Sequence, residues 1–418
     1  MTEPGARFAV EDSPEEAAFR SAARAFLASI APLRTDADDT GSYFVMADAD
    51  PEAHARHVAT ARANQRRIFD GGWAGIAVPH EYGGRGGDPS QERIFRQEQA
   101  RFAIDTGLFS IAHGMVVPTI LAHGTEDQKR RFVEPTLRGD EIWCQLFSEP
   151  GAGSDLAGLT TRAVRDGDEW VVNGQKVWNS SAHHADLGIL LARTDVEAPK
   201  HRGITYFLVD MHTPGVDVRP LRQATGLAHF NEVFLTDVRI PHDRVLGEVN
   251  GGWAVTQTTL MNERTSIGGS GAGAGVSGLL RMARDLGVTG DPAIRQALAA
   301  AFIRAEIVKY LGARTQAAVR AGRQPGPESS VLKLAASLQS APNGDLGLLL
   351  QGAGGMLAGA DAYRRGLYQQ TFVGQWGVRF GGGTEQIQRN VIGERVLGLP
   401  SEPRPDKTAP FKDLPRNA

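Results

Sequence analysis

The sequence predicts a mainly α-helical protein that carries a β-domain in its middle. Residues 1–140 are rich in alanine and repeat their apolar residues every three or four positions, which is typical of amphipathic helices. Residues 141–250 hold short alternating runs with many β-branched residues, which are typical of strands. Residues 251–400 return to long helical runs that suit a bundle, and a proline-rich, charged tail follows at 401–418. We therefore expect three domains and a tail with these bounds.

The composition indicates a soluble globular protein of more than one domain. The chain has 418 residues and a formal net charge of −3, which gives no electrostatic reason to expect a nucleic-acid partner. The N-terminus lacks the pattern of a secretory signal, and no apolar run reaches the roughly 18 residues of a membrane span. The lone Cys144 excludes an intrachain disulfide. We expect a cytoplasmic protein without a membrane partner.

Each part of the chain contains recognisable elements. Helical periodicity predicts N-terminal helices within 13–67 and at 91–103, 111–123 and 126–138, the last capped by Thr125. In the middle part, Asn173 and Gly174 predict a hairpin turn. Further strands are predicted at 189–192, 204–209, 216–219 and 233–235. Long helices are predicted at 293–321 and 329–350 of the C-terminal part.

Two runs in the middle part carry the strongest functional signal. The first is the turn 147–155, which is rich in small residues and hydroxyls, and the second is 170–180, which ends in tryptophan, asparagine and two serines. Together they resemble the flavin-binding signature of the acyl-CoA dehydrogenase family. Further motifs of that family occur in the same order at 78–84, 124–129, 237–247 and 383–398. The resemblance implies an N-terminal helical domain, a middle β-barrel-like domain and a C-terminal four-helix bundle.

The resemblance also implies FAD as the cofactor. By that resemblance Ser148 binds the pyrimidine edge of the flavin, Trp178 packs beside the ring and Ser180 reaches the N5 region. Ser154 is expected near the phosphates or the thioester of the substrate. The full set of implied cofactor residues is Phe147, Ser148, Gly153, Ser154, Trp178, Ser180, Gln351, Gly354, Gly355, Thr384 and Gln386.

Two sequence features concern the binding of the pyrophosphate and adenine parts of FAD. Gln351, Gly354 and Gly355 resemble a turn that approaches the FAD pyrophosphate of a neighbouring subunit, where glycine permits close approach. Many family members grip the adenine half with an arginine–aromatic–glycine run, whereas this chain has a different sequence at 284–290. The resemblance therefore places the flavin ring but not the adenine.

The catalytic base is the central question, because dehydrogenation of an acyl thioester requires removal of the α proton. Many family members have a glutamate directly before the Gly-Thr of the C-terminal signature, and this chain has Gly382 there. The long-chain and isovaleryl branches place the glutamate before an arginine on the first bundle helix, which corresponds to Glu263 and Arg264. Glu263 is thus the candidate base, and Glu232 is a weaker alternative. Implied substrate contacts are Ser154, Arg264, Gly382 and Gly383.

The leading hypothesis is FAD-dependent α,β-dehydrogenation of an acyl-CoA to the trans-2-enoyl-CoA in a homotetramer that reduces an electron-transfer flavoprotein. An acyl-CoA oxidase or flavin monooxygenase on the same fold is a second hypothesis. A third is a non-catalytic subunit of a hetero-oligomeric dehydrogenase, because Gly382 replaces the common carboxylate. A fatty, a branched or a steroid-side-chain acyl group is compatible with each.

A metal site is not expected. His183 and His184 stand close to Asp186, but adjacent histidines on a strand point to opposite faces. His54 and His57 share a helix face without further ligands and suit a solvated surface.

Overall fold

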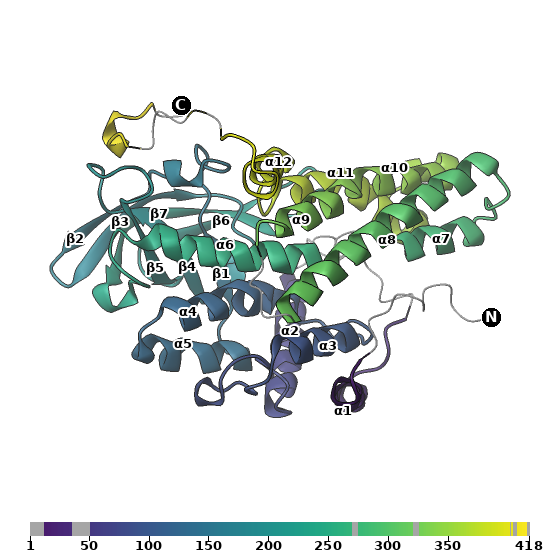
Figure 1. Cartoon of the computed structure of the whole chain (residues 1–418), viewed down its shortest axis with the longest axis horizontal. Helices are drawn as coiled ribbons and strands as arrows, with labels where there is room; N and C mark the ends of the chain where they lie inside the picture. Colours follow the sequence, from purple (N-terminus) through teal and green to yellow (C-terminus); the bar gives the residue numbers. More distant parts are fainter. Residues whose placement is uncertain are drawn as a thin grey trace.

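The computed structural model describes residues 12–35, 51–269, 275–320, 326–401, 403 and 408–415. Helices from the N-terminal part form one layer, a curled β-sheet lies beside them, and a bundle of longer helices extends away from the sheet (Figure 1). This arrangement confirms the predicted mainly α fold with a β-domain. Among the described helices, none is both long and apolar enough to cross a membrane.

The described residues of the N-terminal layer form five α-helices. They are α1 (Pro14–Ile30), α2 (Pro51–Asp70), α3 (Pro89–Gln99), α4 (Val117–His123) and α5 (Glu126–Arg138). Thr125 caps α5 as predicted, since its hydroxyl accepts a hydrogen bond from the Gln128 amide. The helix predicted at 111–123 is instead divided, because Ala112–Val116 is a π-helical turn that leads into α4.

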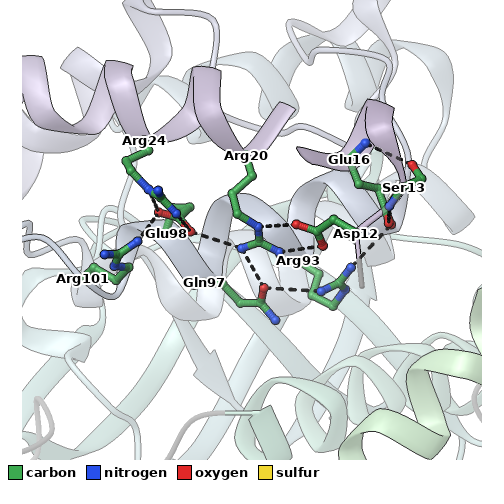
Figure 2. Close-up of polar contacts among 9 residues, drawn as sticks. All are labelled: Asp12, Ser13, Glu16, Arg20, Arg24, Arg93, Gln97, Glu98 and Arg101. Carbon is green, nitrogen blue, oxygen red and sulfur yellow. Dashed lines mark hydrogen bonds and ion pairs between the residues drawn. The ribbon is translucent and has the colours of Figure 1, made fainter. Parts of the chain in front are cut away.

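A charge network fastens α1 to α3. Glu98 on α3 is only 3% exposed, and its carboxylate accepts hydrogen bonds from Arg24 at 2.8 Å, Arg20 at 3.2 Å and Arg101 at 3.0 Å (Figure 2). Arg20 also donates to Asp12 at 2.9 Å. The hydrogen bond from Arg24 and the charges of the arginines lower the pKa of Glu98 to about 2.

The β-domain is a seven-stranded sheet. Its strands are β1 (Trp143–Leu146), β2 (Arg162–Asp166), β3 (Glu169–Lys176), β4 (Leu187–Arg193), β5 (Ile204–Asp210), β6 (Val216–Leu221) and β7 (Phe230–Pro241). Their order is β1-β4-β2-β3-β7-β6, and β5 pairs with β4. Strand β4 is parallel to β1 and β2, and the other pairings are antiparallel.

The hairpin predicted at Asn173 and Gly174 is wrong. Both residues lie inside β3, where the register against β7 shifts, and the β2–β3 turn instead contains Gly167 with φ of +62°. The Asn173 side chain makes two hydrogen bonds to Asp237 on β7, each of 2.9 Å. Its NH₂ group donates to the Asp237 carboxylate, and its carbonyl oxygen accepts from the Asp237 backbone N–H. A Cβ on Gly174 would lie 2.4 Å from the Thr161 hydroxyl. Glycine is therefore needed here for a close approach at a β-bulge, and not for a turn.

Seven α-helices lie in the described residues of the C-terminal part. They are α6 (Gly252–Gly269), α7 (Val276–Asp285), α8 (Pro292–Arg320), α9 (Ser329–Leu338), α10 (Ser340–Gln351), α11 (Leu367–Phe380) and α12 (Glu385–Val391). The single helix predicted at 329–350 is two helices that meet at Gln339. Pro342 accounts for the break, because it lacks an N–H and crowds the carbonyl four residues earlier.

Helix α6 joins the three parts of the molecule. It lies between the sheet, α4 and α9 (Figure 1). The buried Thr259 hydroxyl pairs with Thr119 on α4 at 3.0 Å and with the Tyr206 hydroxyl on β5 at 3.1 Å. This contact fixes α6 against both neighbours, and Glu263 follows one turn later along the same helix.

Candidate functional site

A buried ion pair joins the two signature runs of the β-domain. Lys176 is fully buried at the end of β3, and its ammonium group donates to Glu149 at 2.8 Å and to the Phe147 carbonyl at 3.0 Å. Burial opposes ionisation of Glu149, yet the Lys176 charge and hydrogen bonds from Lys176, Thr161 and Thr160 lower its pKa to about 2. The Glu149 carboxylate therefore stays charged, whereas burial lowers the pKa of Lys176 and the charge of Glu149 opposes that effect. The pair holds the turn after Phe147 against the end of β3.

This contact brings Ser148 close to the second run. The Ser148 carbonyl accepts a hydrogen bond from the Val177 amide at 2.9 Å. The hydroxyls of Ser148 and Ser180 are half-buried, and neither has a hydrogen-bond partner within the part of the chain that the structure describes. Both hydroxyls are consequently available to a polar ligand edge.

Trp178 presents an exposed aromatic ring from a rigid backbone. Its φ is +63° and its side chain is 57% exposed, while its ring edge meets Phe230 at a centroid distance of 5.8 Å. The next residue, Asn179, exchanges backbone hydrogen bonds with Asn231 at 3.0 and 3.1 Å. An exposed indole in a strained conformation that its neighbours hold is typical of a ligand-binding position.

A second set of predicted residues lies on the turn 381–384 between α11 and α12. Gly382 and Gly383 have φ of +65° and +91°, which glycine adopts without strain. Gln388 donates to the Gly382 carbonyl at 2.9 Å, and the Lys333 ammonium group donates to the Gly383 carbonyl at 2.8 Å. Among the described residues, neither glycine N–H donates to an acceptor. The turn thus offers free donors on a backbone that two side chains hold.

Lys333 connects this turn with Glu263. Lys333 on α9 is 1% exposed, and burial lowers its pKa, while the carboxylates of Glu385 and Glu263 oppose that effect. Glu263 therefore lies within electrostatic range of the ammonium group that binds the turn. The half-buried Glu263 is located on α6, which packs against α9.

Not every predicted residue joins this cluster. The side chain of Arg264 lies outside the described residues, and Ser154 and Gln386 are exposed. Gln351, at the end of α10, donates to the Gly347 carbonyl at 2.9 Å. Gln351 and the turn Gly352–Met356 precede the N-terminal end of α11 in the chain. The 381–384 turn follows the C-terminal end of α11. The 14 residues of α11 span about 20 Å, so within one chain Gln351, Gly354 and Gly355 lie far from the 381–384 turn.

Glu232 and the histidine pair 183–184 lie in surroundings that the structure defines. Glu232 on β7 accepts a hydrogen bond from Gln175 on the neighbouring β3 at 3.0 Å, which is a cross-strand contact. His183 and His184 lie on a 3₁₀ turn, and their ring centroids are 3.9 Å apart, so the expectation that they diverge along a strand is wrong. Among the described residues, no group of three or more histidine, cysteine or acidic side chains has the arrangement of a metal site.

Sequence reasoning missed the two buried lysines. Lys176 stands at an inward-facing position of an alternating strand, and Lys333 interrupts an apolar helical run. A lysine at either position indicates a buried polar contact, because lysine is almost never fully buried unless it has a partner. The partners were not readable, since a carbonyl of a distant turn leaves no pattern in the sequence.

The fold and these candidate residues suit a flavin-dependent oxidoreductase, and comparisons with known proteins identify its family. Residues 13–140, 144–238 and 250–397 match the N-terminal, middle and C-terminal domains of acyl-CoA dehydrogenases, respectively. The chain belongs to the acyl-CoA dehydrogenase family, whose members are FAD-dependent.

Relatives and solved structures agree with this family. IpdE1 of Mycobacterium tuberculosis is 38% identical over 82% of this chain and 88% of its own length. FadE34 of the same organism is 42% identical over 78% of this chain, which spans only 45% of that longer protein. The Tcur3481-Tcur3483 steroid ACAD has a TM-score of 0.79 and 28% identity, covering 94% of this chain and 99% of its own. The ChsE4-ChsE5 complex of M. tuberculosis has a TM-score of 0.75 and 28% identity, covering 94% and 100%.

The residues of the site fit a flavin. An exposed Trp178 ring offers an apolar contact to one side of a planar ligand, and the unpartnered hydroxyls of Ser148 and Ser180 suit polar atoms of the ring. A Cβ built on Gly153 meets nothing within 4 Å, so the turn is open there.

Proposed function

We propose that this chain is an acyl-CoA dehydrogenase that oxidises an acyl-CoA thioester to its trans-2-enoyl-CoA and passes the electrons to an electron-transfer flavoprotein. The observation that carries the proposal is that α6, which carries Glu263, packs against α9, whose Lys333 ammonium group holds the Gly382–Gly383 turn. A carboxylate on α6 could therefore replace the one that is absent at Gly382. The family match supports the same reaction class.

Each residue then has a defined role. The free N–H groups of Gly382 and Gly383 bind the thioester oxygen and acidify the α carbon. Glu263 removes the α proton, and Arg264 and Ser154 contribute to binding the substrate. FAD, when bound, supplies the acceptor for the hydride that leaves the β carbon.

The cofactor set follows the family motif. Ser148 and Ser180 bind the polar edge of the flavin, and Trp178 packs beside it. The remaining residues proposed for FAD are Phe147, Gly153, Ser154, Gln351, Gly354, Gly355, Thr384 and Gln386. Since α11 separates Gln351 from the Gly382 turn, we assign Gln351, Gly354 and Gly355 to the cofactor of a neighbouring subunit.

Exposed apolar residues on the bundle support assembly into a homotetramer. One stripe runs along α8 and another along α11, and large apolar surfaces of this kind mark subunit contacts. The stripes consist of Ile303, Ile307 and Tyr310, which are 46–57% exposed, and Val373, Trp376 and Phe380, which are 37–57% exposed.

Replacing the proposed base tests this function. Glu263→Gln keeps the shape of the side chain and removes its basicity, so we expect bound FAD to be retained while its reduction by acyl-CoA slows by about 100-fold or more. The matched control is Glu232→Gln, which alters the cross-strand contact to Gln175 and is expected to leave reduction unchanged. Anaerobic stopped-flow absorbance measures both. An unimpaired Glu263→Gln enzyme would contradict the assignment.

A second candidate is one subunit of a two-chain dehydrogenase that acts on a steroid acyl-CoA. Two structural neighbours are a steroid ACAD named for two components and a two-protein complex. This chain also spans only 45% of FadE34. For this candidate we expect the purified chain to bind acyl-CoA without flavin reduction until a second acyl-CoA dehydrogenase-like chain is added. Flavin reduction by the chain alone would exclude it.

A further inference from the structure

The segment 408–415 lies on the β-domain, far along the chain from the residues that it contacts. Figure 1 shows it in yellow beside the sheet. Pro410 forms an antiparallel bridge with Pro199, the Phe411 amide donates to the Ala198 carbonyl at 3.0 Å and the Lys412 amide donates to the Val196 carbonyl at 3.0 Å. The side chains add an ion pair, in which the Lys412 ammonium group lies 2.6 Å from the Glu197 carboxylate. The segment therefore extends the loop after β4 by strand-like pairing.

Phe411 covers a buried charge. The Arg193 guanidinium at the end of β4 lies 3.7 Å from the centroid of the Phe411 ring, and Arg193 is only 1% exposed. Its terminal nitrogens donate to the carbonyls of Lys200 and Ala157, each at 2.6 Å, whereas its Nε has no hydrogen-bond partner among the residues that the structure describes. Because a buried cation with incomplete hydrogen bonding is costly, the aromatic face compensates part of that cost.

Arg193 in turn holds the signature turn. Its guanidinium binds the carbonyls of Ala157, inside the short helical turn Leu156–Gly158, and of Leu159, directly after it. Lys200, from the loop beneath Phe411, reaches the same turn and donates to both oxygens of Asp155 at 3.1 Å. The contacts therefore form a path from Phe411 through Arg193 and Lys200 to the residue next to Ser154.

We propose that residues 408–415 act as a strap that fixes the turn 149–161, with Phe411 as a positioning residue for the substrate contact at Ser154. This role rests on the proposed function insofar as Ser154 binds acyl-CoA. The strap itself depends only on the contacts of Phe411, Arg193 and the turn.

Amide hydrogen exchange on the full-length protein tests the strap directly. In Phe411→Ala we expect exchange in the peptide 149–161 to become about tenfold faster, with α5 unchanged as the internal reference. The matched control, Lys412→Ala, removes the neighbouring surface ion pair, which is worth little, and should leave exchange unchanged. Phe411→Leu keeps an apolar cover without the aromatic ring, so we expect a smaller increase in the exchange rate of 149–161. This variant tests the strap even if Phe411→Ala does not fold.

The outcomes separate the strap from the function. Unchanged exchange in the Phe411 variants, or equal acceleration of 149–161 and α5, would overturn the strap. Local acceleration supports it, and a severalfold higher KM for acyl-CoA at unchanged kcat then supports the positioning role. Local acceleration with an unchanged KM would leave the strap in place and refute the positioning role of Phe411. Absence of flavin reduction by any acyl-CoA would remove the proposed function and the positioning role that rests on it, and hydrogen exchange alone would still decide the strap.

Discussion

At the residue scale, a buried ammonium group maintains the turn that we propose for substrate binding. The Lys333 ammonium group donates hydrogen bonds to the Gly383 carbonyl at 2.8 Å and to the Arg379 carbonyl at 3.3 Å. Both carbonyls lie near the junction of α11 and α12. Hydrogen bonds from a charged donor are stronger than neutral ones, although burial of the charge offsets part of that gain. The position of Gly383 therefore depends on a residue 50 positions earlier in the chain.

Removing that donor should weaken the fold locally and measurably. We expect Lys333→Met to lower the free energy of unfolding by about 1–3 kcal/mol, because two carbonyls lose their donor. The control Lys309→Met removes an exposed lysine from α8 and should cost less than about 0.5 kcal/mol. Urea denaturation compares the two. Equal effects of both substitutions would show that the Lys333 contact contributes nothing specific.

How far the sequence predicts single residues depends on whether the signal is local. The positions of Ser148, Trp178 and Gly382 were predicted from contiguous motifs, and their roles stay predictions. The environment of Glu263 depends on Lys333 from another helix, and no contiguous pattern encodes that proximity. Motifs identify which residues matter, whereas contacts between helices determine what surrounds them.

At the scale of elements, α1 is attached to α3 by ionised side chains, and this makes its attachment sensitive to pH. The folded protein lowers the pKa of Glu98 from 4.5 to about 2, so the unfolded chain takes up a proton first as the pH falls. The contribution of Glu98 to stability is therefore fully present above about pH 5. It is lost progressively between about pH 4.5 and pH 2.

Comparison with Glu98→Gln isolates this contribution. We expect the variant to be less stable than the wild type by about 1–3 kcal/mol at pH 7, and the difference should shrink as the pH falls toward 2. Urea denaturation of both proteins at pH 7, 5, 4 and 3 measures it. A difference that is independent of pH would mean that the ion pairs in Figure 2 do not account for the effect.

The sequence predicted the type of most elements but not their exact ends. Periodicity placed the helices of all three parts, and Thr125 marked the start of α5 correctly. The Asn173–Gly174 pair was misread because a β-bulge and a tight turn both require glycine. The break between α9 and α10 was missed, although Pro342 carried the signal.

At the scale of the whole molecule, α6 allows residues from distant parts of the chain to act together. It packs on α4, β5 and α9, so one helix contacts the N-terminal layer, the β-domain and the bundle, and the Thr259 hydroxyl fixes it to the first two. The family resemblance predicted this three-part fold, and the comparisons confirm it. Periodicity alone could not have arranged the parts, because their packing depends on contacts far apart in sequence. The exact domain bounds stay predictions.

The most direct test of the central claim is an anaerobic titration of the purified protein with short-chain, long-chain, branched and steroid-side-chain acyl-CoAs, followed by flavin absorbance. Dehydrogenation predicts that one class bleaches the flavin band of the wild type and that Glu263→Gln retains its band. A bound flavin that no acyl-CoA bleaches, or a purified protein that binds no flavin, would contradict the account.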